Sequence, residues 1–304
     1  MNNYVNNTNN VNFLDPQVNQ YGRNMVMTNV VRETKRKYIN IDTQFRDDYN
    51  YNSDANYMIT LPERLTNVKS IMACNAEIPL SFYTISENLG NNCFSITYGG
   101  VAQPVIIPDG DYTTASLSTI INTQIQSLPT NYKTLKHSVI NKFSVFDCSS
   151  GSLTVNFDVN STGIFDKYNF KSKLGWILGF RKQQYTITTA STKSECFINL
   201  YGPKYLYLVI DEFSQKNPNS FISPQSDFLM SKNILARITI NSTAFPFGSI
   251  LPANNFNGVL LTDKRNYGGV IDIKKFNVQL VNEIGIPMNL NGLDFSFCLE
   301  VEHE

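Results

Sequence analysis

The sequence predicts an all-β protein: an antiparallel β-sandwich of the single jelly-roll type, with decorated loops or a small β insertion and one short helix. Short runs of β-branched and aromatic residues recur from residue 35 to the end, and clusters of Gly, Pro, Asn and Asp separate them without a repeating strand-helix rhythm. With 304 residues, of which 42% are hydrophobic, the chain is long enough to bury the core of such a fold.

Residues 1–34 differ in composition from the rest of the chain. This segment is crowded with Asn and nearly free of charge, and its apolar residues are too sparse to mark a periodic face. We expect an N-terminal arm, either a disordered tail or an extended segment that becomes ordered against neighbouring subunits. The basic run Lys35, Arg36, Lys37 leads directly into a β pattern, which is more typical of a solvated strand entrance than of a nucleic-acid contact.

Residues 35–304 are expected to form the jelly-roll domain. In the closing run LDFSFCLEVE, apolar residues alternate with polar ones, as in a strand with one buried face. The strand-like runs outnumber the eight strands of a simple jelly roll, so we expect decorated loops or an inserted β lobe at about residues 130–200. Within that lobe, Ser149, Ser150 and Gly151 join the runs KFSVFDC and SLTVNFDV and predict a hairpin.

One segment, TTASLSTIINTQIQSL, predicts a helix. Its apolar residues follow the three-four spacing of a helix with one buried face. Thr113 or Thr114 can cap its start, and Pro129 ends it. The apolar positions are Leu117, Ile120, Ile121, Ile125 and Leu128.

The charge balance argues against a role that depends on phosphate contacts. Lys plus Arg and Asp plus Glu both total 25, so the chain has no overall field that would draw it to nucleic acid or to an acidic membrane. No stretch approaches the roughly 20 apolar residues of a membrane span, and a signal-peptide pattern is absent. We expect a soluble protein made inside a cell, without direct nucleic-acid contact.

The residues that usually carry chemistry are few and dispersed. The five cysteines never form a CxxC pair, so we expect free thiols in a reducing compartment, no metal and no other cofactor. A nucleophilic triad would have to use His137, because the only other histidine, His303, lies at the carboxyl end. We interpret the scattered acidic residues as strand-end charges and turn acceptors, and we expect no enzymatic activity. These residues are Asp42, Asp47, Asp48, Asp211 and Glu212.

Two apolar segments are unusual for a simple sandwich. In LGWILGF, two glycines flank the only tryptophan and predict close packing of backbone against a ring, in the core or at a subunit contact. The stretch FPFGSILP is too apolar for an ordinary loop, so it either meets a partner or folds over its own sandwich. With the apolar residues of the arm, these segments supply the candidate interface residues: Phe13, Leu14, Met25, Trp176, Phe245, Phe247 and Leu251.

Several blocks, in order along the chain, resemble the penton and minor capsid proteins of nucleocytoplasmic large DNA viruses, the icosahedral giant viruses. The resemblance covers most of residues 37–302. The blocks are YINID at 38–42 with FRD at 45–47, LTNVKSI at 65–71 with AEIP at 76–79, GNNCFSI at 90–96, GDYT at 110–113, LGFR at 178–181, GVIDI at 269–273 and DFSF at 294–297.

The resemblance implies a structural virion protein built on a single jelly roll. It implies a capsid subunit, most specifically the penton at the five-fold vertices, made in the host cytoplasm and assembled with itself as a pentamer and with neighbouring major or minor capsid proteins. A minor capsid protein beneath the shell is the first alternative. The second is a jelly-roll module that binds carbohydrate for host attachment, which the aromatic loop Tyr49, Asn50, Tyr51 motivates.

Overall fold

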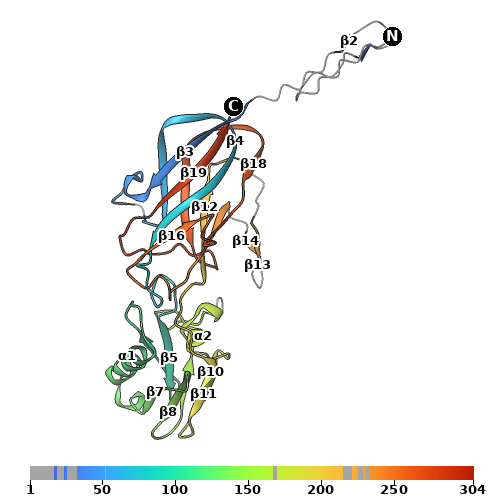
Figure 1. The fold of residues 1–304 in the computed structure, drawn as a ribbon. Helices are drawn as coiled ribbons and strands as arrows, with labels where there is room; N and C mark the ends of the chain where they lie inside the picture. Colours follow the sequence, from blue (N-terminus) through green and yellow to red (C-terminus); the bar gives the residue numbers. More distant parts are fainter. Residues whose placement is uncertain are drawn as a thin grey trace.

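The structure is a computed structural model. It describes residues 17–18, 24–25, 33–51, 53–166, 170–214, 221–224, 229–230 and 233–304. Its strands form a β-sandwich and, between strands β4 and β12, an inserted lobe of residues 85–200. Figure 1 shows the sandwich above and the inserted lobe below, with the carboxyl terminus at the end of the sandwich that faces away from the lobe.

One curled antiparallel sheet of eight strands builds the sandwich, in the order β17-β15-β12-β18-β4-β19-β3, with β16 also paired to β4. All of its pairings are antiparallel. The strands are β3 (Lys35–Asp42), β4 (Asn56–Pro79), β12 (Tyr205–Asp211), β15 (Ile234–Thr239), β16 (Ile250–Asn254), β17 (Leu260–Thr262), β18 (Arg265–Val281) and β19 (Ser296–His303).

Two long strands, β4 and β18, turn this single sheet into two layers. They stay paired from Asn56 opposite Gln279 to Ile71 opposite Arg265, with three register shifts along the way. Near the middle of β4, Asn67 adopts a positive φ of 55°, and its N–H donates to the Asp272 carboxylate at 3.1 Å. Such irregularities bend strands sharply. Both strands therefore fold over the end of the sandwich, and each contributes to both layers (Figure 1).

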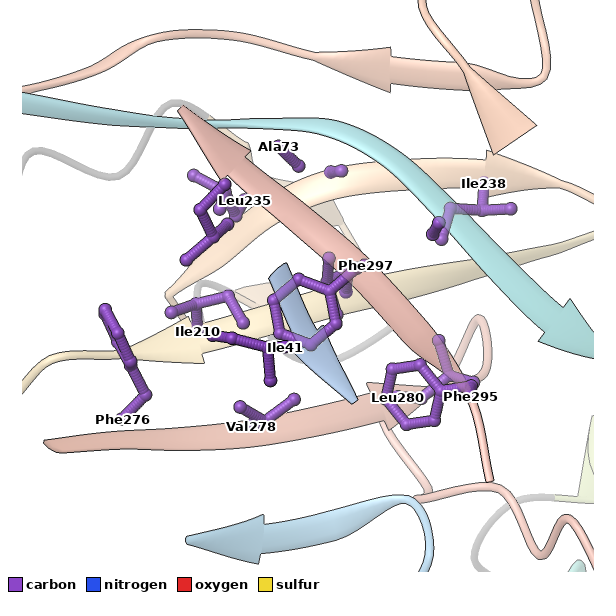
Figure 2. Close-up of a cluster of buried hydrophobic side chains, with 14 of the residues drawn as sticks. Ile41, Ala73, Ile210, Leu235, Ile238, Phe276, Val278, Leu280, Phe295 and Phe297 are labelled. Carbon is purple, nitrogen blue, oxygen red and sulfur yellow. The ribbon is translucent and has the colours of Figure 1, made fainter. Parts of the chain in front are cut away.

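The main core lies between the layers. It combines side chains from the first strands of the chain with side chains from the last, such as Ile41 with Phe297 and Ala73 with Leu235, and Figure 2 shows part of this cluster. Phe295 and Phe297, which the closing alternation predicted to point inward, are buried here, with ring centroids 5.9 Å apart. The predicted all-β, antiparallel, jelly-roll-like sandwich is confirmed.

The inserted lobe has a second, separate core. A four-stranded sheet runs in the order β10-β9-β5-β6, and a three-stranded sheet in the order β11-β8-β7. These strands are β5 (Cys93–Tyr98), β6 (Val101–Ile106), β7 (Leu135–Ile140), β8 (Phe143–Cys148), β9 (Leu153–Asn156), β10 (Gln184–Ile187) and β11 (Thr192–Phe197). The remaining described elements are the helices α1 (Thr114–Ser127) and α2 (Leu174–Ile177), the 3-10 turns Thr43–Phe45, Thr130–Tyr132 and Phe170–Ser172, and two short strand pairs, β1 (Gln17–Val18) with β2 (Asn24–Met25) and β13 (Ser223–Pro224) with β14 (Leu229–Met230).

Helix α1 forms where the sequence predicted it. The Thr113 hydroxyl accepts the Ser116 N–H, and the Ser116 hydroxyl accepts the Thr113 N–H, so a reciprocal capping box begins the helix. Leu117, Ile121 and Ile125 are buried in the core of the lobe. The single-turn helix α2, which contains Trp176, was not predicted.

Two sequence predictions for this region need correction. The expected lobe began at about residue 130, but β9 pairs with β5, so residues from 93 onward belong to the same sheet. The expected hairpin at residues 149–151 was wrong, because β8 pairs with β7 and β11 while β9 pairs with β5 and β10. The two strands that this turn joins lie in different sheets.

Candidate functional site

A polar pocket lies among loops of the sandwich, close to the point where the chain enters the inserted lobe. Its volume is about 580 Å³. The loop before β4, the loop between β18 and β19, and Asn88 near the start of the lobe surround it. The lining residues are Arg46, Tyr49, Asn50, Ser53, Asp54, Asn88, Pro287, Met288, Asn289 and Gly292.

Arg46 and Tyr49 form one wall of this pocket. The Arg46 side chain is only 6% exposed, and its Nη1 lies 2.7 Å from Asp294 Oδ1 and donates to the Thr43 carbonyl at 3.0 Å. The guanidinium carbon lies 3.8 Å from the centre of the Tyr49 ring, and the Tyr49 hydroxyl donates to Asp294 Oδ2 at 3.3 Å. Asp294 therefore neutralises Arg46, and the wall is held in place by several bonds.

Asp54 holds the opposite loop. Its Oδ2 accepts hydrogen bonds from the N–H groups of Leu290, at 3.0 Å, and Gly292, at 3.1 Å. Asn88 Nδ2 donates to the Pro287 carbonyl at 3.1 Å and so connects the lobe to the same loop. Because hydrogen bonds tie each segment to another part of the chain, the pocket is formed before any ligand arrives.

The groups considered for catalysis have structural roles. His137 is buried in the core of the lobe, where its ring packs on Phe146 at a centroid distance of 5.0 Å and its Nδ1 lies 3.1 Å from the Ser118 hydroxyl. Burial lowers the pKa of His137 to about 4. A neutral imidazole enclosed by the core has no access to a substrate.

The acidic residues singled out in the sequence each take part in local structure. Asp42 caps the turn that follows β3, Asp47 accepts hydrogen bonds from the backbone and the hydroxyl of Thr60, and Asp211 accepts the Phe213 N–H. Glu212 forms a buried ion pair with Arg265. Asp48 adopts a positive φ in a turn, where its carbonyl accepts the Tyr51 N–H.

The described residues contain no group of three His, Cys, Asp or Glu side chains arranged to hold a metal ion. All five cysteines are free thiols; Cys93 and Cys148 are buried, and the other three are partly buried. Burial raises the pKa of the Cys74, Cys93 and Cys298 thiols. A raised thiol pKa reduces the thiolate fraction and with it the reactivity of these residues.

The basic run at the start of β3 faces an acidic strand. β3 pairs with β19, and Arg36 Nε lies 3.5 Å from Glu300 Oε1 and 3.6 Å from Glu302 Oε1. Glu302 also accepts a 2.6 Å bond from Lys264. This pairing agrees with the interpretation of the run as a strand entrance, since the carboxylates offset its charge locally.

The candidate interface residues fall into different environments. Phe13 and Leu14 lie outside the described residues, and Met25 lies in β2, where only the backbone is described. Trp176 is half-buried, with its ring edge-on to Phe170 and the Arg181 guanidinium 3.9 Å from its centre. Leu251 is fully buried in the sandwich core, which corrects its assignment as a contact residue, because its side chain offers no surface to a partner.

The predicted packing of backbone against a ring in LGWILGF is observed at Gly175, whereas Gly179 closely approaches backbone. A methyl group on Gly175 would overlap the Phe157 ring, and one on Gly179, whose φ is +95°, would overlap the Cys196 carbonyl. The ring that packs against Gly175 is that of Phe157, and not that of Trp176 between the two glycines. Only glycine satisfies both positions.

Residues 245–261 carry apolar side chains on the surface of the sandwich, and we call them the apolar segment. Phe245 packs against the main core, whereas Phe247 is 50% exposed and stacks on Tyr83 with the ring centroids 5.8 Å apart. Ile250 is 63% exposed, and Phe256, in the turn after β16, is fully exposed. Sequence reasoning missed Phe256, because a single aromatic between asparagines gives no periodic signal.

Together these features define an all-β, jelly-roll-like protein with an inserted lobe, a preformed polar pocket and an apolar surface segment. Among the described helices, none is long and apolar enough to cross a membrane. No family model matches the chain, and no curated protein matches it. Among solved structures, it is similar to the crystal structure of the mavirus penton protein, with a TM-score of 0.43 and 8% identity over 89% of this chain and 100% of that chain. At this identity, no site residue can be transferred.

Proposed function

We propose that this chain is a structural subunit of the capsid of an icosahedral large DNA virus, and specifically the penton protein at the five-fold vertices. A minor capsid protein beneath the shell is the alternative position for the same kind of subunit. In either position the chain is made in the host cytoplasm, is incorporated into the virion, and acts by burying surface against its neighbours without enzymatic turnover.

The observation that carries this proposal is where the family-like blocks lie in the fold. The block at 38–42 forms most of β3, the block at 294–297 leads into β19, the blocks at 65–71 and 76–79 lie in β4, and the block at 269–273 lies in β18. These strands are direct neighbours, in the order β18-β4-β19-β3. Blocks from both ends of the chain therefore meet in one continuous part of the sheet.

The blocks within the inserted lobe also occupy framework positions. Phe94 and Phe180 are fully buried in its core, and the Gly110 and Ile85 backbones exchange two hydrogen bonds next to the start of α1. What resembles the capsid family is thus the framework of the fold and not a reactive centre. That distribution is expected for a protein whose function is to present surfaces.

The apolar segment supports a role in assembly. Ile250 at the start of β16 and the fully exposed Phe256 after its end leave apolar area in water that contact with a neighbour would remove. In a closed symmetric ring each copy repeats this contact, so a modest contact per copy can hold the whole assembly.

Locating the chain in the intact particle tests the proposal. A reconstruction of the virion should show it at the five-fold vertices as a pentamer, and mass photometry of the purified chain should show closed oligomers. Density beneath the shell would assign the minor capsid position instead. A chain that remains monomeric at high concentration and is absent from purified particles would refute the capsid function in both forms.

A further inference from the structure

We propose that the polar pocket beside Tyr49 binds a neutral carbohydrate. The size and the preformed shape of the pocket give the first argument. Its volume of about 580 Å³ falls within the roughly 300–1,000 Å³ that is usual for small-ligand sites. The bonds from Asp54 to residues 290 and 292, and from Asn88 to Pro287, fix its two sides, so little ordering cost remains for binding.

The lining groups favour a ligand that is rich in hydroxyl groups. Three asparagines, at positions 50, 88 and 289, line the pocket, and each amide offers donors and acceptors side by side. Among the described residues, the Asn50 side chain makes no hydrogen bond, while Asn88 uses its Nδ2 and Asn289 its Oδ1, which leaves the other atom of each amide for a ligand. Adjacent sugar hydroxyls each donate and accept, which matches this set.

Tyr49 supplies the apolar part of the site. One face of its ring is covered by the Arg46 guanidinium, and the residue is 43% exposed. A partly exposed aromatic ring that is held rigidly can pack against the C–H face of a sugar ring at little entropic cost. Rings of Tyr together with Asn amides combine apolar and polar contact in the way that a sugar requires.

The charge of the pocket excludes acidic sugars. Among the described residues that line the pocket, Arg46 is the one cationic group; it is paired with Asp294, and its Nη1 is bonded to that carboxylate and to the Thr43 carbonyl. Asp54 adds a negative charge to the lining. A sialylated or sulfated glycan would bring a further anion to a pocket whose described lining residues offer no unpaired cation, and the cost of desolvating that anion would not be compensated.

The test is direct binding to the full chain. An array of neutral oligosaccharides built from glucose, galactose, mannose or N-acetylglucosamine, printed beside sialylated and sulfated glycans, identifies a probe, and calorimetric titration with that probe measures its affinity. We expect neutral glycans to bind and acidic ones not to bind. Tyr49→Ala and Asn50→Ala should each weaken binding about tenfold or more, since each removes a direct contact.

Tyr51→Ala is the matched control. Tyr51 is 91% exposed, lies in the same loop and is not among the lining residues, so its removal should change affinity by less than about twofold. Asn50→Ala should not disturb folding, because it removes no buried side chain. It therefore tests the glycan contact on its own if Tyr49→Ala fails to fold. Lack of binding to every neutral glycan, binding restricted to acidic glycans, unchanged affinity in Asn50→Ala, or an equal loss in Tyr51→Ala would each overturn the proposal. None of these results depends on the position of the chain in a particle.

Discussion

Arg265, at the start of β18, and Glu212, just after β12, form an ion pair inside the protein. Arg265 Nη1 lies 2.8 Å from Glu212 Oε2, and both side chains are almost completely removed from solvent. The same guanidinium donates to the carbonyls of Ile210 and Asn233. It therefore ties the end of β12 to the start of β15 at the base of the segment that joins these two strands.

Replacing Arg265 should be costly for stability. Arg265→Met leaves the Glu212 carboxylate buried without its partner, and we expect a loss of about 3–5 kcal/mol in the free energy of unfolding. Urea denaturation followed by circular dichroism measures this loss. The double variant Arg265→Met/Glu212→Leu should recover most of it, because no charge then stays buried.

The control for this prediction is an exposed pair. Arg64 and Asp272 lie 3.7 Å apart with both side chains largely in solvent, so Arg64→Met should change stability by less than about 1 kcal/mol. If Arg265→Met costs no more than Arg64→Met, the buried pair does not hold β12 and β15 together.

His137 should make the stability of the protein depend on pH. Its pKa is about 4 in the folded chain against 6.5 in the unfolded chain, so the unfolded state takes up the proton first as the pH falls. The contribution of neutral His137 is fully present above pH 6.5 and is lost as the pH falls towards 4. We expect a loss of about 3 kcal/mol across that window, measured by urea denaturation at a series of pH values.

His137→Phe isolates this contribution. The aromatic replacement still packs on Phe146, and the Ser118 hydroxyl keeps its bond to the backbone carbonyl of residue 137. Between pH 6.5 and 4, the stability of the variant should fall less than that of the parent chain. If the free energy of unfolding falls equally steeply with pH in both proteins, the pKa of His137 is not lowered in the folded chain, and the prediction is wrong.

Gly175 should not tolerate a side chain. In Gly175→Ala the new methyl group overlaps the Phe157 ring, which is itself enclosed by Phe94, Phe146 and Phe180. We expect the variant to lose about 1–3 kcal/mol of stability through overpacking of the lobe. Gly268→Ala is the matched control, because a methyl group there meets no atom within 4 Å; a similar loss in both variants would contradict the packing argument.

Phe256 should contribute to assembly if the apolar segment is a contact. Phe256→Ser should raise the concentration for half-dissociation of the oligomer about tenfold or more, as measured by mass photometry. The monomer should keep its stability, because this ring is fully exposed. Phe165→Ser, at an exposed aromatic of the inserted lobe, is the comparison; equal weakening by both changes would argue against a specific role for the segment.

The elements that the sequence predicted correctly are those whose signal lies within one short segment of the chain. Helix α1 followed from its apolar spacing, its Thr113 cap and Pro129, all within one segment. The inward side chains of β19 followed from strict alternation, which places successive residues on opposite faces of a strand. The close approach at Gly175 and Gly179 followed from small residues within an apolar run.

The errors came from features that depend on distant residues. The turn at 149–151 has the composition of a hairpin turn, but the partners of β8 and β9 come from residues 93–98, 135–140 and 184–197, so the chain changes sheets there. Leu251 lies in an apolar stretch with exposed neighbours, and only the pairing of β16 with β4 turned its side chain inward.

Local patterns along the chain were enough to predict antiparallel strands, the position of helix α1 and the burial of the apolar side chains of the last strand, because periodicity and capping act between residues close in the chain. Long-range contacts set the remaining features: the two layers formed by β4 and β18, the separate core of the lobe, the Arg265–Glu212 pair and the pocket beside Tyr49. Each joins groups far apart in the sequence, such as Asp54 with Leu290, and no local pattern encodes which strands become neighbours.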